Sequence, residues 1–145
     1  MSKTQVLIDS IAGTAGAVFG FLFGKVTGIF WALIAFMALD YITGVIIAII
    51  NKKLSSEVGF KGLAKKFLIL IFVSVGHIAD TYVLGGAPVA MSAVILFYLA
   101  NEGISIIENA ASLGLPVPKK LQDVLEQIRN KSENDTNEGG NNNAS

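Results

Sequence analysis

The sequence predicts an all-α integral membrane protein with three or four transmembrane helices, and four is the arrangement that we favour. First, residues 26–50 contain a single charged residue, Asp40, and roughly 20 apolar residues are enough to cross a bilayer as a helix. Second, further apolar segments occupy residues 5–24, 67–84 and 89–110. Third, only 15% of the 145 residues are charged, whereas about 25% is usual for a soluble domain.

These segments divide the chain into a membrane domain and a polar carboxyl-terminal region. We assign residues 1–112 to the membrane domain, 113–129 to a proline-containing connector with a short amphipathic helix, and 130–145 to a disordered tail. The net charge is zero, yet all eleven basic residues lie outside the four apolar segments. The chain has no cysteine, which excludes disulfides and thiolate metal sites.

The first apolar segment, residues 5–24, begins a series of glycines spaced four residues apart. On a helix this spacing leaves bare backbone along one face, where a second helix can approach closely. The face could serve packing within the chain or self-association of copies. Asp9 weakens this segment as a span, so an alternative with three spans keeps it in the membrane interface. The glycines of the ridge are Gly16, Gly20, Gly24 and Gly28.

The orientation follows from a lysine-rich loop that we expect at residues 51–66. Short lysine-rich loops remain in the cytoplasm. The third segment would then leave the cytoplasm and the fourth would return through a turn at residues 85–88, which makes the carboxyl tail cytoplasmic. The loop has one acid, Glu57, and five lysines: Lys52, Lys53, Lys61, Lys65 and Lys66.

Two acids and the histidine lie within the second and third segments: Asp40, Asp80 and His77. A charged group at the bilayer centre costs about 3 kcal/mol on insertion scales, so it must face water or other polar groups. His77 and Asp80 share one helix face, where the imidazole could hydrogen-bond the carboxylate. These residues could form a proton relay or ion site, or could satisfy one another between helices.

The fourth segment carries a polar stripe at helical spacing opposite an apolar face. Several copies with their stripes turned inward could enclose water. Alternatively, the helix leaves the membrane near the start of the stripe, which is then a wet helix end. With the three polar residues above, the stripe completes our set of candidate pore-facing residues. Its members are Asn101, Glu102, Ser105, Glu108 and Asn109.

Beyond the fourth segment, Gly114, Pro116 and Pro118 are expected to end the helix. A short amphipathic helix follows, and its basic residues could hold it at anionic headgroups. Its apolar face comprises Leu121, Val124, Leu125 and Ile128. The asparagine-rich tail after it has too few apolar residues to fold.

The sequence contains no phosphate-binding loop, no nucleophile elbow and no histidine pair for zinc. It has one histidine and no cysteine. We therefore predict that the protein is not an enzyme, and we assign no catalytic, cofactor-binding or metal-binding residue. A basic surface for nucleic acid is also missing.

Six short motifs follow one another along the chain. They are Asp40-Tyr41-Ile42-Thr43-Gly44-Val45, Asn51-Lys52-Lys53-Leu54-Ser55-Ser56, Gly59-Phe60-Lys61-Gly62-Leu63, His77-Ile78-Ala79-Asp80, Asn101-Glu102-Gly103-Ile104-Ser105-Ile106-Ile107-Glu108-Asn109 and Pro116-Val117-Pro118-Lys119-Lys120. In these motifs and their order, residues 22–128 resemble the bacteriophage holin family, which also includes clostridial toxin-secretion proteins.

The resemblance implies a lysis protein that needs no catalytic residue. A holin accumulates in the host cytoplasmic membrane, assembles into oligomers and opens lesions at a set time, after which an endolysin reaches the cell wall. The implied partners are copies of the same chain and the bilayer, while the endolysin requires no direct contact. The alternatives are a small ion- or proton-coupled transporter, a holin-like exporter of a bacterial toxin, and a passive membrane anchor.

Overall fold

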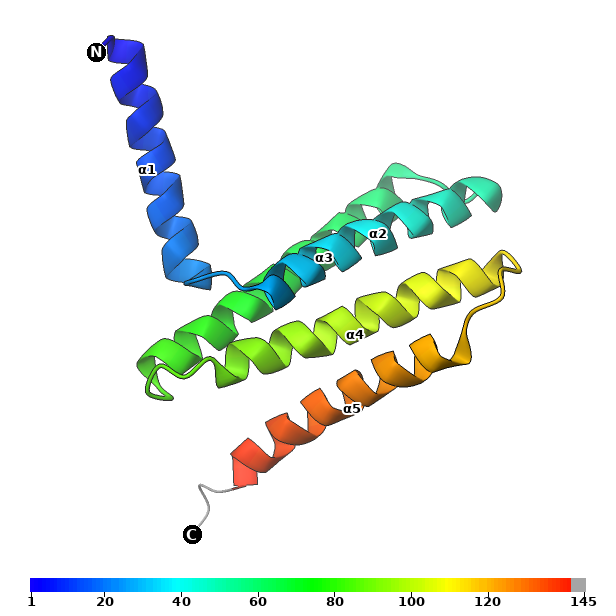
Figure 1. Cartoon of the computed structure of the whole chain (residues 1–145). Helices are drawn as coiled ribbons and strands as arrows, with labels where there is room; N and C mark the ends of the chain where they lie inside the picture. The colour runs from blue at the N-terminus through cyan, green and yellow to red at the C-terminus, as the bar shows by residue number, and fades with distance from the viewer. Residues whose placement is uncertain (142–145) are drawn as a thin grey trace.

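The computed structural model describes residues 1–141, with side chains described up to Asn134. Within these residues the fold is all-α, as predicted, and it contains no strand. Figure 1 shows the helices in chain order. They are α1 (Lys3–Phe23), α2 (Gly28–Ile50), α3 (Ser56–Tyr82), α4 (Val89–Ser112) and α5 (Lys119–Asn141).

Helix α4 is the centre of the bundle. It packs against α2, α3 and α5, and Figure 1 shows it between the α2–α3 layer and α5. The innermost side chains are Leu33, Val73 and Ile95, one from each of α2, α3 and α4, and each is at most 1% exposed. Because every side of α4 has a neighbour, this helix presents less free surface than α1, α2 or α3.

Helices α3 and α4 approach one another closely at Gly76. A Cβ atom at this position would lie 2.8 Å from the Cα of Met91, which is too close for any residue larger than glycine. The two helices are joined by a tight turn in which Gly85 and Gly86 adopt positive φ angles of 82° and 95°, a region that glycine enters without strain. The predicted turn at residues 85–88 therefore lies between α3 and α4.

Helix α1 projects away from the bundle (Figure 1). Residues 1–21 are all exposed, and Phe23 is its one buried residue. The Phe23 ring lies 5.3 Å from the ring of Phe30 in α2, so α1 is attached to the rest of the chain at its carboxyl end.

The predicted lysine-rich loop is shorter than expected. Only residues 51–55 connect α2 to α3, and Lys61, Lys65 and Lys66 lie on α3. The hydroxyl of Ser55 accepts a hydrogen bond from the Val58 N–H at 3.2 Å, and such a cap stabilises a helix start by about 1 kcal/mol. This cap starts α3 ahead of the lysines, which are compatible with a helix.

Three of the described helices, α1, α2 and α4, are long and apolar enough to cross a membrane. The length and composition of α1 thus support residues 5–24 as a transmembrane span, which Asp9 had put in question. Helix α3 falls outside this set, since its apolar stretch lies between Lys66 and Asp80. A four-span arrangement, which stays a prediction, requires α3 as the fourth span.

Helix α5 differs from the predicted short helix and disordered tail, because it continues through residues 130–141. Leu125 is 6% exposed and packs near Gly103 of α4. Leu121 and Val124, which we placed on the same apolar face, are about half exposed. Adding a residue to a formed helix is far easier than starting one. This explains why the polar residues 130–141 continue the helix. Residues 142–145 of the predicted tail lie outside the described residues.

Candidate functional site

Three charged side chains from three helices meet inside the bundle. The Lys66 ammonium on α3 donates to one carboxylate oxygen of Asp40 on α2 and to one of Glu102 on α4. The side chains of Lys66, Asp40 and Glu102 are only 13%, 15% and 4% exposed. We call these three residues the charge cluster.

Neutral polar groups extend the charge cluster along α2 and α4. The Asn109 amide donates to the Thr43 hydroxyl at 2.9 Å and to the second oxygen of Asp40 at 3.4 Å. The Thr43 hydroxyl donates to the backbone carbonyl of Asp40 at 3.0 Å. A cavity of about 230 Å³ adjoins these groups, and Ser105 contributes to its wall. Asp40 and Thr43 of α2 and Glu102 and Asn109 of α4 therefore find their hydrogen-bond partners in one another and in Lys66.

The charge cluster fixes how α3 sits against the other two helices. Removing one partner of a buried ion pair costs about 3–5 kcal/mol, because the remaining charge is left without compensation in a medium of low dielectric constant. Lys66 is the cation that makes Asp40 and Glu102 tolerable within apolar helices.

Asp80 makes a second buried polar contact, between α3 and the start of α4. Its two carboxylate oxygens accept hydrogen bonds from the backbone N–H groups of Ala90 and Met91, at 2.7 and 2.8 Å. The first N–H groups of a helix have no partner within it, and a carboxylate also suits the positive end of the helix dipole. Asp80 therefore caps α4 from a neighbouring helix.

His77 lies away from this carboxylate, so the His77–Asp80 hydrogen bond considered from the sequence is replaced by other contacts. The imidazole packs against Gly24, where an added Cβ would lie 2.3 Å from its Cε1 atom. Gly24 has φ +59° and ends α1. Asp80 thus stabilises the junction of α3 and α4, whereas His77 packs against the turn between α1 and α2.

The structure divides the predicted polar stripe of α4. Glu102 and Asn109 turn toward α2 and α3, and Ser105 borders the adjoining cavity. Asn101 is half-buried and Glu108 is exposed. In a single copy most of the stripe is satisfied within the chain, and the pore-facing role that we assigned to it stays a prediction.

The structure also divides the glycine ridge. Gly16 and Gly20 lie on α1, Gly24 forms the turn, and Gly28 begins α2. A Cβ atom at Gly16 or Gly20 would meet nothing within 4 Å. The described residues therefore use neither glycine for packing within the chain, and self-association through this face stays a prediction.

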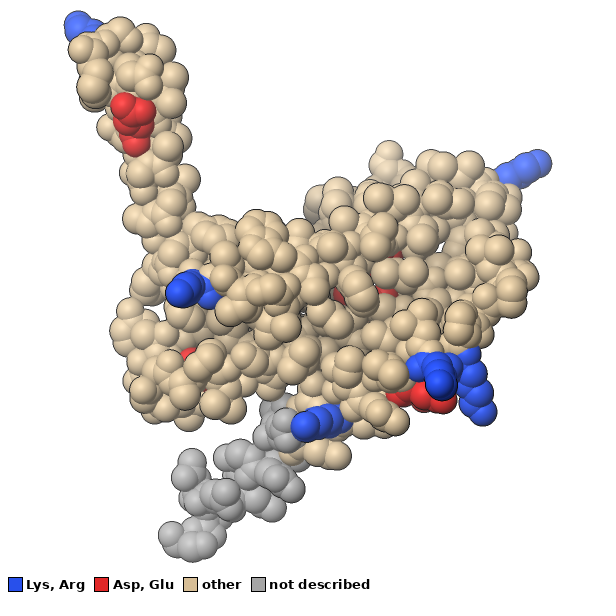
Figure 2. All heavy atoms as spheres, in the orientation of Figure 1, with Lys and Arg blue, Asp and Glu red and all other residues tan. Residues whose placement is uncertain are grey.

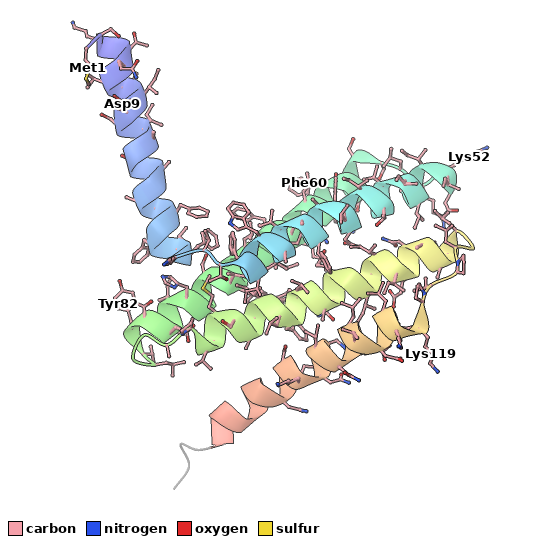
Figure 3. The ribbon with its side chains drawn as sticks, viewed as in Figure 1. Met1, Asp9, Lys52, Phe60, Tyr82 and Lys119 are labelled. Carbon is pink, nitrogen blue, oxygen red and sulfur yellow. The ribbon has the colours of Figure 1, made fainter. Side chains whose placement is uncertain are left out.

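Several basic residues mark one end of the bundle. Figure 3 places Lys52 and Lys119 at this end, and Tyr82 at the other. In Figure 2 most of the visible surface is uncharged; Lys and Arg side chains stand mainly at the right and lower margins, and one stands on the face near the left end. Lysines before α3 and at the start of α5 thus share one end, as the predicted topology requires. Among the side chains that the structure describes, no three His, Asp or Glu residues lie together so that they could hold a metal ion.

The pairing of Lys66 with the membrane acids was not predicted from the sequence, because this lysine was expected in a loop. A signal was present. Asp40 and Glu102 both need a cation, and Lys66 directly precedes an apolar run that is itself helical. Reading Lys66 as part of that helix would have indicated the pairing.

The sequence model of the bacteriophage holin family matches residues 17–130. The chain is 46% identical over 110 residues to the uncharacterized protein Lin0175 of Listeria innocua, covering 76% of this chain and 78% of that protein. It is 40% identical over 116 residues to the uncharacterized 14.9 kDa protein in the nagH 3′ region of Clostridium perfringens, covering 80% and 88%. It is 35% identical over 124 residues to the uncharacterized protein YtkC of Bacillus subtilis, covering 86% and 92%. No solved structure matches the chain. Because the family model covers residues 17–130, this chain belongs to the bacteriophage holin family.

Proposed function

We propose that the chain acts as a holin in the bacterial cytoplasmic membrane. Copies accumulate there, associate with one another and open lesions through which an endolysin reaches the cell wall, so that the host lyses at a set time. The family match over residues 17–130 is the observation that carries this proposal. Three helices of spanning length and apolar composition support the membrane location.

The exposed helix α1 is the part of the chain that we propose for self-association. Its glycines at positions 16 and 20 are open, and small residues at this spacing let two membrane helices approach through their backbones. Since this contact leaves the bundle of α2, α3 and α4 intact, copies can assemble before any lesion opens.

The charge cluster supports a closed form of the single copy. Its acids are paired with Lys66 inside the bundle, so a single copy exposes few charges to lipid. In the lesion, we propose that α3 and α4 separate and that the stripe containing Glu102 and Ser105 turns toward water shared by several copies. Hydration then replaces Lys66 as the source of stabilisation for the acids.

Expression in bacteria with and without a cytoplasmic endolysin tests this proposal. We expect growth arrest and loss of membrane potential with the chain alone, and rapid clearing only when the endolysin is present. Normal growth and an intact potential in both cultures would reject the proposal. An endolysin carrying its own export signal serves as the control for lysis without a holin.

A small ion- or proton-coupled transporter is the second candidate, and the buried charge cluster is the observation that favours it. A transporter would move its ion while retaining cytoplasmic proteins, so the endolysin culture would stay turbid. A holin-like toxin exporter would release a cytoplasmic protein from cells that survive. A passive anchor would leave the membrane sealed.

A further inference from the structure

The charge cluster contains more acid than base. Asp40 and Glu102 provide two carboxyl groups, and Lys66 provides one ammonium. The residues that complete the site, Thr43, Ser105 and Asn109, are uncharged. With every group ionised, the cluster would therefore carry one net negative charge inside an apolar bundle.

No second cation compensates this charge within the described part of the chain. Lys65 and the phenol of Tyr41 also border the adjoining cavity, but Lys65 is exposed. Lys61 pairs with Glu57 at 3.2 Å on the surface of α3. From α4 the cluster receives Glu102 and Asn109, and α5 lies beyond α4, where Leu125 is the side chain that reaches Gly103.

The two acids also share one partner. The single ammonium of Lys66 donates to an oxygen of Asp40 and to an oxygen of Glu102, so the two carboxyl groups lie on either side of one nitrogen inside the bundle. Two carboxyl groups that share a site cannot both ionise without strong repulsion.

We propose that the charge cluster is a proton-binding site of the closed chain. Asp40 and Glu102 share one proton, Lys66 remains charged, and the cluster as a whole is neutral. Because the two acids interact, the proton belongs to the pair rather than to either residue. Opening the bundle would hydrate both acids and release this proton; that second step depends on the proposed function, whereas the site itself does not.

The bound proton makes stability depend on pH with a defined sign. Above about pH 5.5 the carboxyl groups of an unfolded chain are ionised, given their ordinary pKa values near 4. The folded chain then holds one proton more than the unfolded chain, so raising the pH favours unfolding. One proton corresponds to a tenfold rise in the unfolding equilibrium constant per pH unit. The dependence ends at the pH where the folded pair itself loses the proton.

The test measures unfolding of the purified full chain in detergent micelles, by loss of helical circular dichroism, from about pH 5.5 upward, above the ordinary carboxyl pKa values. We expect the unfolding equilibrium constant of the wild type to rise tenfold per pH unit. Glu102→Gln and Asp40→Asn each leave one acid opposite Lys66, and both variants should lose this pH dependence. Glu57→Gln, in the exposed pair with Lys61, should retain the pH dependence.

Equal pH dependence in the wild type and in both cluster variants would overturn the proposal. Stabilisation by Na⁺ at fixed pH and constant ionic strength, without the pH dependence, would also overturn it and assign a metal cation instead. Infrared spectroscopy provides a second measurement on the unaltered chain. A carboxylic acid C=O band at neutral pH that disappears in Glu102→Gln supports the site, and its absence from the wild type contradicts it.

These measurements separate the proton site from the proposed function. A proton-dependent stability in a chain that fails to promote endolysin-dependent clearing leaves the site in place and rejects the holin role. Clearing by a chain without the pH dependence retains the holin role and rejects the proton site.

Discussion

The carboxylate of Asp80 accepts a hydrogen bond from the backbone N–H of Met91 at 2.8 Å, and this contact ties the end of α3 to the start of α4. Its other oxygen binds the N–H of Ala90. Since Asp80 is only 2% exposed, its removal takes the acceptor from the buried N–H of Met91 and from the part-buried N–H of Ala90.

Asp80→Ala should therefore lower the free energy of unfolding by about 1–3 kcal/mol, the usual cost of an unsatisfied buried polar group. Asp80→Asn keeps one acceptor oxygen and should lose less. The measurement is unfolding of the purified chain in detergent micelles. Asp9→Asn, an exposed carboxylate on α1, is the matched control and should stay within about 0.5 kcal/mol of the wild type. Equal stability of Asp80→Ala and the control would show that Asp80 does not hold α4.

Replacing the cation of the charge cluster should be more damaging than replacing a surface lysine. Lys66→Met leaves Asp40 and Glu102 buried without an ammonium, and we expect a loss of about 3–5 kcal/mol in the same unfolding measurement. Lys61→Met removes only an exposed pair with Glu57 and should cost about 0.5 kcal/mol or less.

A triple variant shows whether the loss in Lys66→Met comes from charge. Adding Asp40→Asn and Glu102→Gln to Lys66→Met removes all three ionisable groups while keeping the approximate shape of the side chains. Apolar or neutral replacement of a complete buried ion pair is often nearly neutral, so much of the lost stability should return. A triple variant as unstable as Lys66→Met would attribute the effect to packing of the lysine stem.

The class of fold could be predicted from the sequence because the governing signals are local. Apolar runs, a glycine–proline turn at residues 85–88 and the prolines after α4 depend only on neighbouring residues. These signals placed α2 and α4 to within a few residues. The start of α3 was missed because a capping serine and a helical run of lysines resemble a polar loop in composition.

The charge cluster could not be predicted in the same way, because it depends on how three helices are rotated against one another. The sequence identified Asp40 and Glu102 as residues that need a partner, and the pairing with Lys66 becomes apparent only once this lysine is placed on α3 and not in a loop. Likewise, the hydrogen-bond partners of Asp80 are backbone N–H groups, and no residue type in the sequence indicates them. Such contacts follow from packing. The close approach of α3 and α4 at Gly76 was likewise not predicted from the sequence.

Gly76 should be intolerant of even a small side chain. A Cβ atom there would lie 2.8 Å from Met91 Cα and 2.9 Å from its nitrogen, so Gly76→Ala must push α3 and α4 apart. Overpacking of this kind costs about 1–3 kcal/mol. Gly44→Ala is the control, since Gly44 of α2 has open space and alanine favours a helix by about 0.5–1 kcal/mol over glycine. Destabilisation of both variants alike would contradict the close approach at Gly76.

Enlarging the open glycines of α1 should separate assembly from folding. A Cβ atom at Gly16 or Gly20 meets nothing within 4 Å in the single copy, so the bundle in Gly16→Leu and Gly20→Leu should be as stable as in the wild type. In the membrane, a leucine on this face would prevent close backbone approach between copies. We expect fewer cross-linked oligomers and delayed clearing with endolysin. Val18→Leu, an exposed position on the opposite face of the helix, should leave both unchanged. Normal oligomers and normal clearing in both glycine variants would move the association surface away from α1, toward the exposed apolar residues of α2 and α3.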